Sequence, residues 1–113
     1  MPHQSDLSRA LAEFSAAIAR QQGDRFRHAV LFGSHARGTS HEQSDVDVAV
    51  ILSEMPDGLI DTTIAMTDVA YDVLLDTGID IQPVPVPQDQ WDHPERHSNP
   101  WLIEAIRREG VRL

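Results

Sequence analysis

The chain of 113 residues contains no cysteine and no lysine. Without cysteine it cannot form disulfides, thiolate zinc sites, iron–sulfur clusters or a cysteine nucleophile. Without lysine it can use neither Schiff-base chemistry nor a P-loop lysine. No apolar run approaches the roughly 18–20 residues of a membrane span, and the first residues lack the pattern of a signal peptide. We therefore expect a cytoplasmic protein that does not associate with membranes.

Positive charge is also scarce, because 9 arginines stand against 18 acidic residues and give a net charge of −9. This balance argues against a long nucleic acid as partner, since phosphate backbones require a basic footprint. It allows a small anionic substrate held through metal ions, or a basic protein partner. Apolar residues make up 41% and charged residues 24%, which predicts a single folded domain over residues 1–113.

Hydrophobic periodicity predicts alternating helices and strands, and therefore an α/β domain with helices around a small sheet in the order αβ(α)βαβα. Three alternating prolines, Pro83, Pro85 and Pro87, remove backbone donors, so that strand must lie at an edge or leave the sheet. The expected helices cover 6–22, capped by Ser5 or Asp6, then 59–76, and 100–109, capped by Asn99. The expected strands cover 27–32, 45–52 and the residues from 79 onward. Loops are expected over 35–44, with a helical turn after Ser34 as an option, and over 88–98.

Acidic residues occur at the start of the second expected strand. Residues two apart on a strand point to the same face, about 6.6 Å apart, so Asp45 and Asp47 present two neighbouring carboxylates. They repel each other unless a cation lies between them, and their oxygen atoms suit magnesium, or manganese as the alternative. A third carboxylate, Asp80 on the next strand, would complete a site for two ions about 3.5–4 Å apart, which suits in-line displacement at phosphorus.

The second half of this site is expected from Gly33 and Ser34, which directly follow the first strand. Glycine permits close backbone approach to a ligand, and a turn into a short helix directs N–H groups at an anion. The Ser34 hydroxyl adds a donor for the terminal phosphates of a nucleotide. Arg37 is a further candidate for contact with phosphate or base, and an ion pair with Glu42 is the structural alternative.

The stretch from Phe32 to Asp47 contains Gly-Ser, an Ala-Arg-Gly turn and Ser-Asp-x-Asp. It resembles the signature of the minimal nucleotidyltransferase branch of the DNA polymerase beta-like nucleotidyltransferase superfamily, and the ending over 106–113 looks like that branch as well. The resemblance implies a nucleotidyltransferase fold with a small mixed sheet. It also implies that Gly33 and Ser34 contact the phosphates, that Asp45 and Asp47 bind both metals, and that Asp80 binds the catalytic metal and helps to deprotonate the acceptor hydroxyl.

The same resemblance implies a substrate and a partner. Minimal members often pair with a helical HEPN-type ribonuclease toxin, and in some pairs they transfer AMP from ATP to a tyrosine hydroxyl of that toxin. Larger relatives carry an additional domain for the acceptor or the base, and this sequence has none. The acidic chain suits a basic ribonuclease surface, so we expect ATP with two Mg²⁺ ions as the reactants and a HEPN-type toxin as the acceptor.

Two other functions stay open from the sequence. The chain could neutralise a toxin by contact alone, or it could modify a small molecule of the aminoglycoside type, with a homo-oligomer supplying part of the pocket. Histidines at 35 and 41 are expected to be solvated loop residues, and a zinc site from His93 and His97 is opposed by Pro94 between them. Acidic residues follow the outer side of the expected helix over 59–76 and form either a solvated face or a contact for a basic partner. They are Asp57, Asp61, Asp68, Asp72 and Asp76.

Overall fold

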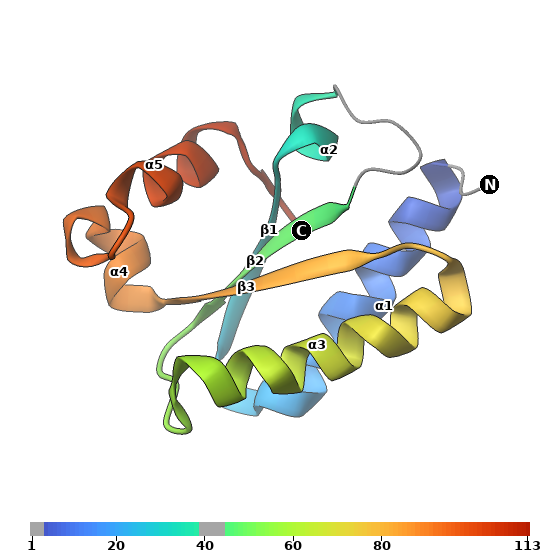
Figure 1. The fold of residues 1–113 in the computed structure, drawn as a ribbon, viewed down its shortest axis with the longest axis horizontal. Helices are drawn as coiled ribbons and strands as arrows, with labels where there is room; N and C mark the ends of the chain where they lie inside the picture. Colours follow the sequence, from blue (N-terminus) through green and yellow to red (C-terminus); the bar gives the residue numbers. More distant parts are fainter. Residues whose placement is uncertain (1–3, 39–44) are drawn as a thin grey trace.

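A computed structural model describes residues 4–38 and 45–113. It is a mixed sheet flanked by helices, with the acidic and glycine-containing segments at one end (Figure 1). The elements are α1 (Gln4–Gln22), η1 (Gly23–Arg25), β1 (Phe26–Phe32), α2 (Ser34–Arg37), β2 (Val46–Leu52), α3 (Gly58–Thr77), β3 (Ile81–Pro87), α4 (Gln88–Asp92), η2 (Pro94–Arg96), α5 (Pro100–Glu109) and β4 (Val111–Arg112).

The sheet has the strand order β3-β2-β1-β4. β1 runs antiparallel to β2 and to β4, whereas β2 and β3 are parallel. The C-terminal end of β1 therefore lies at the same end of the sheet as the first residues of β2 and β3. The turn after Phe32 and the first residues of β2 and β3 therefore meet at this end of the sheet.

The edge position expected for the proline-rich strand is confirmed by β3. The Val46 N–H donates to the Asp80 carbonyl at 2.9 Å, so alternate residues of β3 from Asp80 onward direct their backbone groups at β2. Pro83, Pro85 and Pro87 lie at the intervening positions, where the absent N–H would point away from β2. The prolines thus leave the ladder intact and remove donors from the outer edge of the strand.

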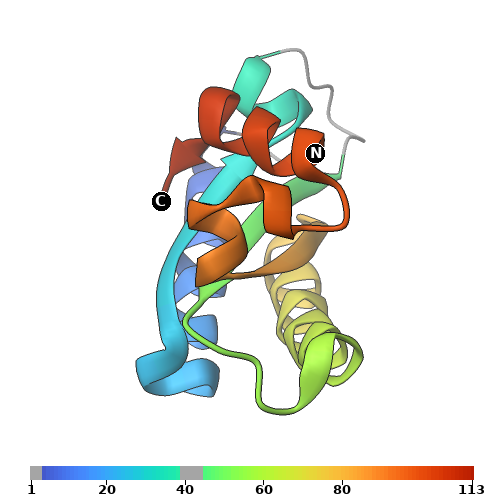
Figure 2. The ribbon, with the colours of Figure 1, turned by 90° about the vertical axis from the view of Figure 1, so that its left-hand side faces the viewer.

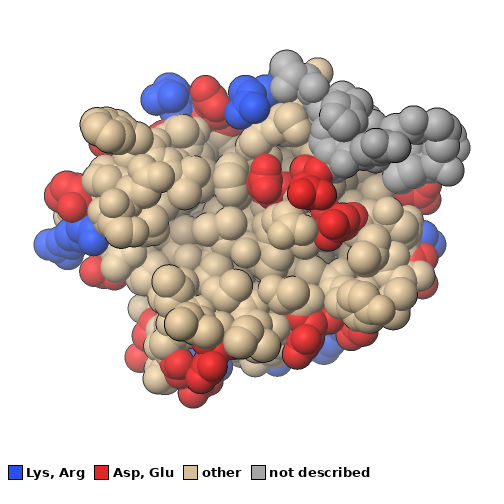
Figure 3. All heavy atoms as spheres, in the orientation of Figure 1, with Lys and Arg blue, Asp and Glu red and all other residues tan. Residues whose placement is uncertain are grey.

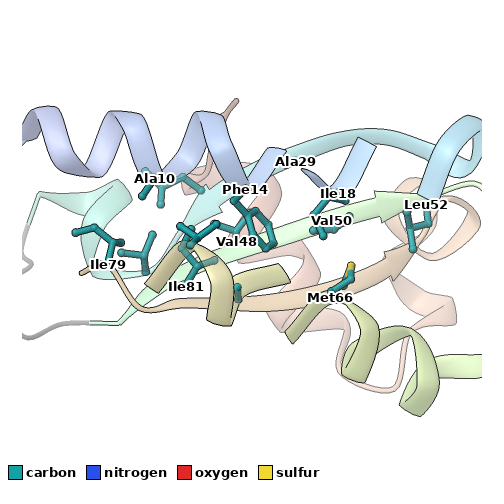
Figure 4. Close-up of a cluster of buried hydrophobic side chains, with 14 residues drawn as sticks. Ala10, Phe14, Ile18, Ala29, Val48, Val50, Leu52, Met66, Ile79 and Ile81 are labelled. Carbon is teal, nitrogen blue, oxygen red and sulfur yellow. The ribbon is translucent and has the colours of Figure 1, made fainter. Parts of the chain in front are cut away.

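The two faces of the sheet are covered by different helices (Figure 2). One face packs on α1 and α3 through a cluster that includes Phe14, Ile18, Val48, Val50 and Met66, which are all fully buried (Figure 4). The alternate residues of the strands form a second, smaller cluster with α5, through side chains such as Ala49, Ile51, Val86, Ile103 and Ile106. Because burial of apolar area stabilises the fold at about 25 cal/mol per Å², these clusters hold the strand ends in register.

Several details correct the sequence-based expectations. The expectation of a loop over 88–98 is wrong, because most of this segment forms α4 and η2. In α4 the rings of Trp91 and His28 make an edge-to-face contact, with their centroids 5.7 Å apart. The strand β4 is not anticipated, because only two residues pair with β1. Ser5 and Asp6 lie inside α1, so neither is its cap. Asn99 does cap α5, its side chain accepting from the Leu102 N–H at 3.3 Å.

Candidate functional site

Asp47 is the second residue of β2, and Asp45 directly precedes the strand. Asp47 pairs with Phe32 on β1 and with Gln82 on β3, whereas its neighbour Val46 is buried toward α1 and α3. Two residues further along β2, Ala49 is completely buried under α5, but Asp47 remains half exposed. Acidic side chains gather beside the segment drawn in grey (Figure 3). Asp47, at the beginning of β2, is therefore partly exposed on a sheet face that is buried two residues further along.

Asp45 and Asp47 affect one another electrostatically. Burial raises the pKa of the Asp47 carboxyl, and the negative charge of Asp45 raises it further. Electrostatic interactions with His35 and Arg37 act in the opposite direction and lower the Asp47 pKa. Two repelling carboxylates, one of them partly desolvated, are an arrangement that a divalent cation would stabilise. The oxygen donors present fit a hard ion such as Mg²⁺.

Gly33 connects this pair to the preceding strand. Its backbone has φ 76° and ψ −153°, a combination that is essentially restricted to glycine. A Cβ at this position would collide with Oδ2 of Asp47. The backbone therefore passes directly against the carboxylate, and the Gly33 carbonyl accepts from the Arg37 N–H at 3.2 Å to close the turn of α2. Ser34 follows this turn as the first residue of α2.

Asp80 occupies the same end of the sheet but has a different environment. It is exposed, and its Oδ1 accepts from Gln82 Nε2 at 3.1 Å. Its carbonyl accepts from Val46, so its backbone lies next to the start of β2. Within residues 4–38 and 45–113, no three His, Asp or Glu side chains are close enough together to enclose a metal ion. Asp45 and Asp47 are close enough to interact electrostatically. Asp80 lies on the neighbouring strand, but among the described residues the three side chains do not form one cluster.

The guanidinium group of Arg37 in α2 lies next to the C-terminal end of α5. The expected helical turn after Ser34 is confirmed as α2, and Arg37 forms an ion pair with Glu109 at 3.7 Å. Glu109 also pairs with Arg108 at 3.6 Å. The alternative partner proposed from the sequence, Glu42, lies outside the described residues, as does His41. Glu109 was not anticipated because 72 residues of sequence separate it from Arg37 and no local pattern links them.

Two histidines considered as zinc ligands have other contacts. His93 Nδ1 lies 3.5 Å from Glu95, and His97 Nδ1 accepts from the Asn99 N–H at 2.9 Å. Both contacts organise the turns between α4 and α5. None of the helices in the described part of the chain is long and apolar enough to cross a bilayer.

Solved structures share this fold. A minimal nucleotidyltransferase aligns with a TM-score of 0.62 and 25% identity, over 100% of this chain and 97% of that one. A chain from a toxin–antitoxin structure with AMP-PNP aligns with a TM-score of 0.61 and 21% identity, over 92% and 69%. A structure of a tri-AMPylated Shewanella oneidensis HEPN toxin with its MNT antitoxin gives a TM-score of 0.53 and 18% identity, over 91% and 70%. At the identities of the last two, the likeness shows the fold alone.

Sequence relatives point in the same direction. A candidate protein adenylyltransferase of Methanocaldococcus jannaschii, MJ1305, is 38% identical over 84 residues, which are 74% of this chain and 57% of that protein. A second one, MJ0141, is 39% identical over 51 residues, or 45% and 52% of the two chains. The matches thus span little more than half the length of these curated relatives. Residues 16–85, more than half of the chain, match the profile of the family described as Polymerase beta, Nucleotidyltransferase, and the chain belongs to this nucleotidyltransferase family.

Proposed function

We propose that this chain is a metal-dependent nucleotidyltransferase that transfers AMP from ATP to a hydroxyl group of a partner protein. The observation that carries the proposal is the close approach of the Gly33 backbone to Asp47, whose carboxyl pKa is raised by burial and by the nearby charge of Asp45. Because the glycine backbone and the carboxylate lie side by side, a phosphate chain on the backbone N–H groups and cations on the carboxylate could share one site. An ATP-rich compartment such as the cytoplasm suits this reaction.

The roles of the residues follow from their positions. Asp45 and Asp47 would hold Mg²⁺, with Asp80 contributing from the neighbouring strand, and Mn²⁺ is the alternative ion. A bound divalent cation would supply positive charge against the charge that develops on the α-phosphate. Gly33 and Ser34 would hold the terminal phosphates so that the leaving pyrophosphate is aligned with the attacking hydroxyl. Arg37, fixed by Glu109 at the end of α2, would add a positive charge beside the phosphates.

We infer from the relatives that the acceptor is a HEPN-type toxin, and that AMP transfer neutralises it. One fold neighbour was solved with a tri-AMPylated HEPN toxin and another with AMP-PNP, and two relatives are candidate protein adenylyltransferases. Neutralisation by contact alone is the second candidate, supported by the strongly acidic character of the chain, whose net charge is −9.

Label transfer from α-³²P-ATP to a HEPN-type partner in the presence of Mg²⁺ tests the proposal. We expect Asp45→Asn with Asp47→Asn to abolish transfer. Asp24→Asn is the matched control, because this exposed carboxylate lies in η1 at the opposite end of β1. Transfer that survives the double substitution would refute the site, and neutralisation without any label transfer would favour the contact mechanism.

A further inference from the structure

The outer side of α3 carries large apolar side chains where a solvated helix face would be polar. Ile60, Ile64, Tyr71 and Leu75 each have between 56% and 73% of their surface exposed. They follow each other at intervals of four, seven and four residues, so they lie within about 60° of one another around the helix axis. The buried residues of α3, such as Met66 and Val73, occupy the opposite side. We call these four residues the α3 stripe.

Acidic side chains follow one side of the α3 stripe only. Asp61, Asp68 and Asp72 are exposed and lie about 80–120° around the helix from Ile60. The other side of the stripe carries Thr63 and Thr67, whose hydroxyls donate to carbonyls of their own helix. Acidic side chains are visible along the lower rim of the molecule, where α3 lies in Figure 1 (Figure 3). The helix face is therefore apolar in the middle, negative on one flank and neutral on the other.

The negative flank continues into a groove between α3 and α1. This groove has a volume of about 450 Å³, an apolar floor that includes Ala16, Ala17 and Val69, and carboxylates from Glu13, Asp72 and Asp76. Glu13 shares a hydrogen bond with Asp76, which raises the pKa of the Glu13 carboxyl. Arg20 is the one basic residue in the lining. A second cation entering the groove would relieve this crowding of carboxyl groups.

We propose that the α3 stripe and the acidic groove form a docking surface for an amphipathic helix of the partner protein, with arginine or lysine on the side that faces the groove. Exposed apolar stripes with a polar rim are typical of such helix-in-groove contacts. The charge of the flank selects a basic partner. The identity of that partner as a HEPN-type toxin rests on the proposed function.

A second copy of this chain fits the surface poorly. In an antiparallel two-fold pair, each flank of the stripe faces the same flank of the other copy. Asp61, Asp68 and Asp72 would then face their own counterparts, in a chain of net charge −9. Like charges opposite one another are destabilising.

The surface is separate from the proposed site but reaches the same end of the sheet. α3 packs on the face opposite to the one that carries Asp47. Its last residue, Thr77, precedes Asp80 by three positions, so the Leu75 end of the stripe approaches the start of β3. A partner helix on the stripe would be held beside the candidate catalytic end without covering it. Substitutions on α3 should therefore separate docking from chemistry.

The test titrates a HEPN-type partner against the full chain at about 50 mM and about 500 mM salt. We expect Ile64→Asp with Tyr71→Asp to weaken binding at least about 100-fold, because buried tyrosine and isoleucine contacts dominate such interfaces. We expect Asp68→Asn with Asp72→Asn to weaken binding about 3–10-fold at low salt and to reduce its salt dependence. Trp101→Asp is the matched control, since Trp101 is 82% exposed on α5 and lies outside this surface. Thermal melts of each variant verify folding.

The outcomes distinguish the two proposals. AMP transfer to the partner that is unchanged in the α3 variants would overturn the docking surface and leave the enzymatic function standing. Binding that the α3 variants abolish, in a chain that transfers no label, would support the surface and overturn the enzymatic function. Loss of binding in Trp101→Asp alone would place the interface on α5. A wild-type dimer that the α3 variants convert to monomers would make a second copy the occupant, and a chain that binds no HEPN-type partner would overturn both proposals.

Discussion

Replacing Gly33 with alanine tests the structural basis of the site most directly. The backbone at φ 76° and ψ −153° costs a residue with a side chain about 1–3 kcal/mol. The added Cβ also collides with Asp47 Oδ2, and an overlap of this kind costs about 1–3 kcal/mol more. We expect Gly33→Ala to lower the free energy of unfolding by about 2–6 kcal/mol. For a chain of this size, each kcal/mol lowers Tm by about 4 °C.

Gly38→Ala is the matched control for this substitution. Gly38 also has a positive φ, 74°, but among the described residues a Cβ there would have no atom within 4 Å. Its cost is therefore backbone strain alone, about 1–2 kcal/mol. Chemical denaturation of both variants measures the difference that contact with Asp47 makes.

A double-mutant cycle isolates that contact. Asp47→Ala removes the carboxylate that the Cβ would meet and leaves the backbone strain of Gly33→Ala in place. We expect the cost of Gly33→Ala to fall by about 1–3 kcal/mol in the Asp47→Ala background. An identical cost in both backgrounds would refute the argument that close approach to Asp47 requires glycine at this position.

Other substitutions separate stability from function. Asp47→Asn should raise Tm at neutral pH in EDTA, because burial and the Asp45 charge raise the Asp47 pKa and so disfavour its ionised form in the fold; a lower Tm would contradict this. Arg37→Ala and Glu109→Gln break the same partly exposed ion pair, so each should change the free energy of unfolding by less than about 1 kcal/mol. A larger loss of label transfer in Arg37→Ala than in Glu109→Gln would identify contact between Arg37 and the substrate. Equal losses would show that the ion pair only positions α2. Burial, followed by the charge of Arg112, lowers the His28 pKa although Asp92 opposes this, so the fold favours the neutral ring. The resulting stability is present above the unfolded pKa near 6.5 and is lost as pH falls through the folded pKa. Denaturation curves of His28→Gln should lack this loss, so the stability of the wild type relative to His28→Gln should increase as pH rises; a relative stability that decreases as pH rises would contradict the sign.

Tertiary packing decided features that local patterns could not show. The run 88–98 is polar and contains Pro94, which favours a loop, yet Trp91 contacts His28 and α4 forms on that packing. The strand β4 exists because the end of α5 returns the chain to β1. The acidic face of α3 is visible in the sequence, but its apolar stripe becomes significant only because the opposite side of α3 is buried.

What the sequence by itself determined was local. The spacing placed Asp45 directly before β2 and Asp47 inside it, close enough for the charge of Asp45 to raise the Asp47 pKa. Glycine at position 33 was required by a backbone that no other residue adopts readily. The tertiary structure alone decided which distant segments meet there: Glu109 pairs with Arg37, and the Asp80 carbonyl accepts from the Val46 N–H. Periodicity encodes which way a side chain points along its own segment, whereas contacts between segments depend on strand order and on how far α5 covers the sheet.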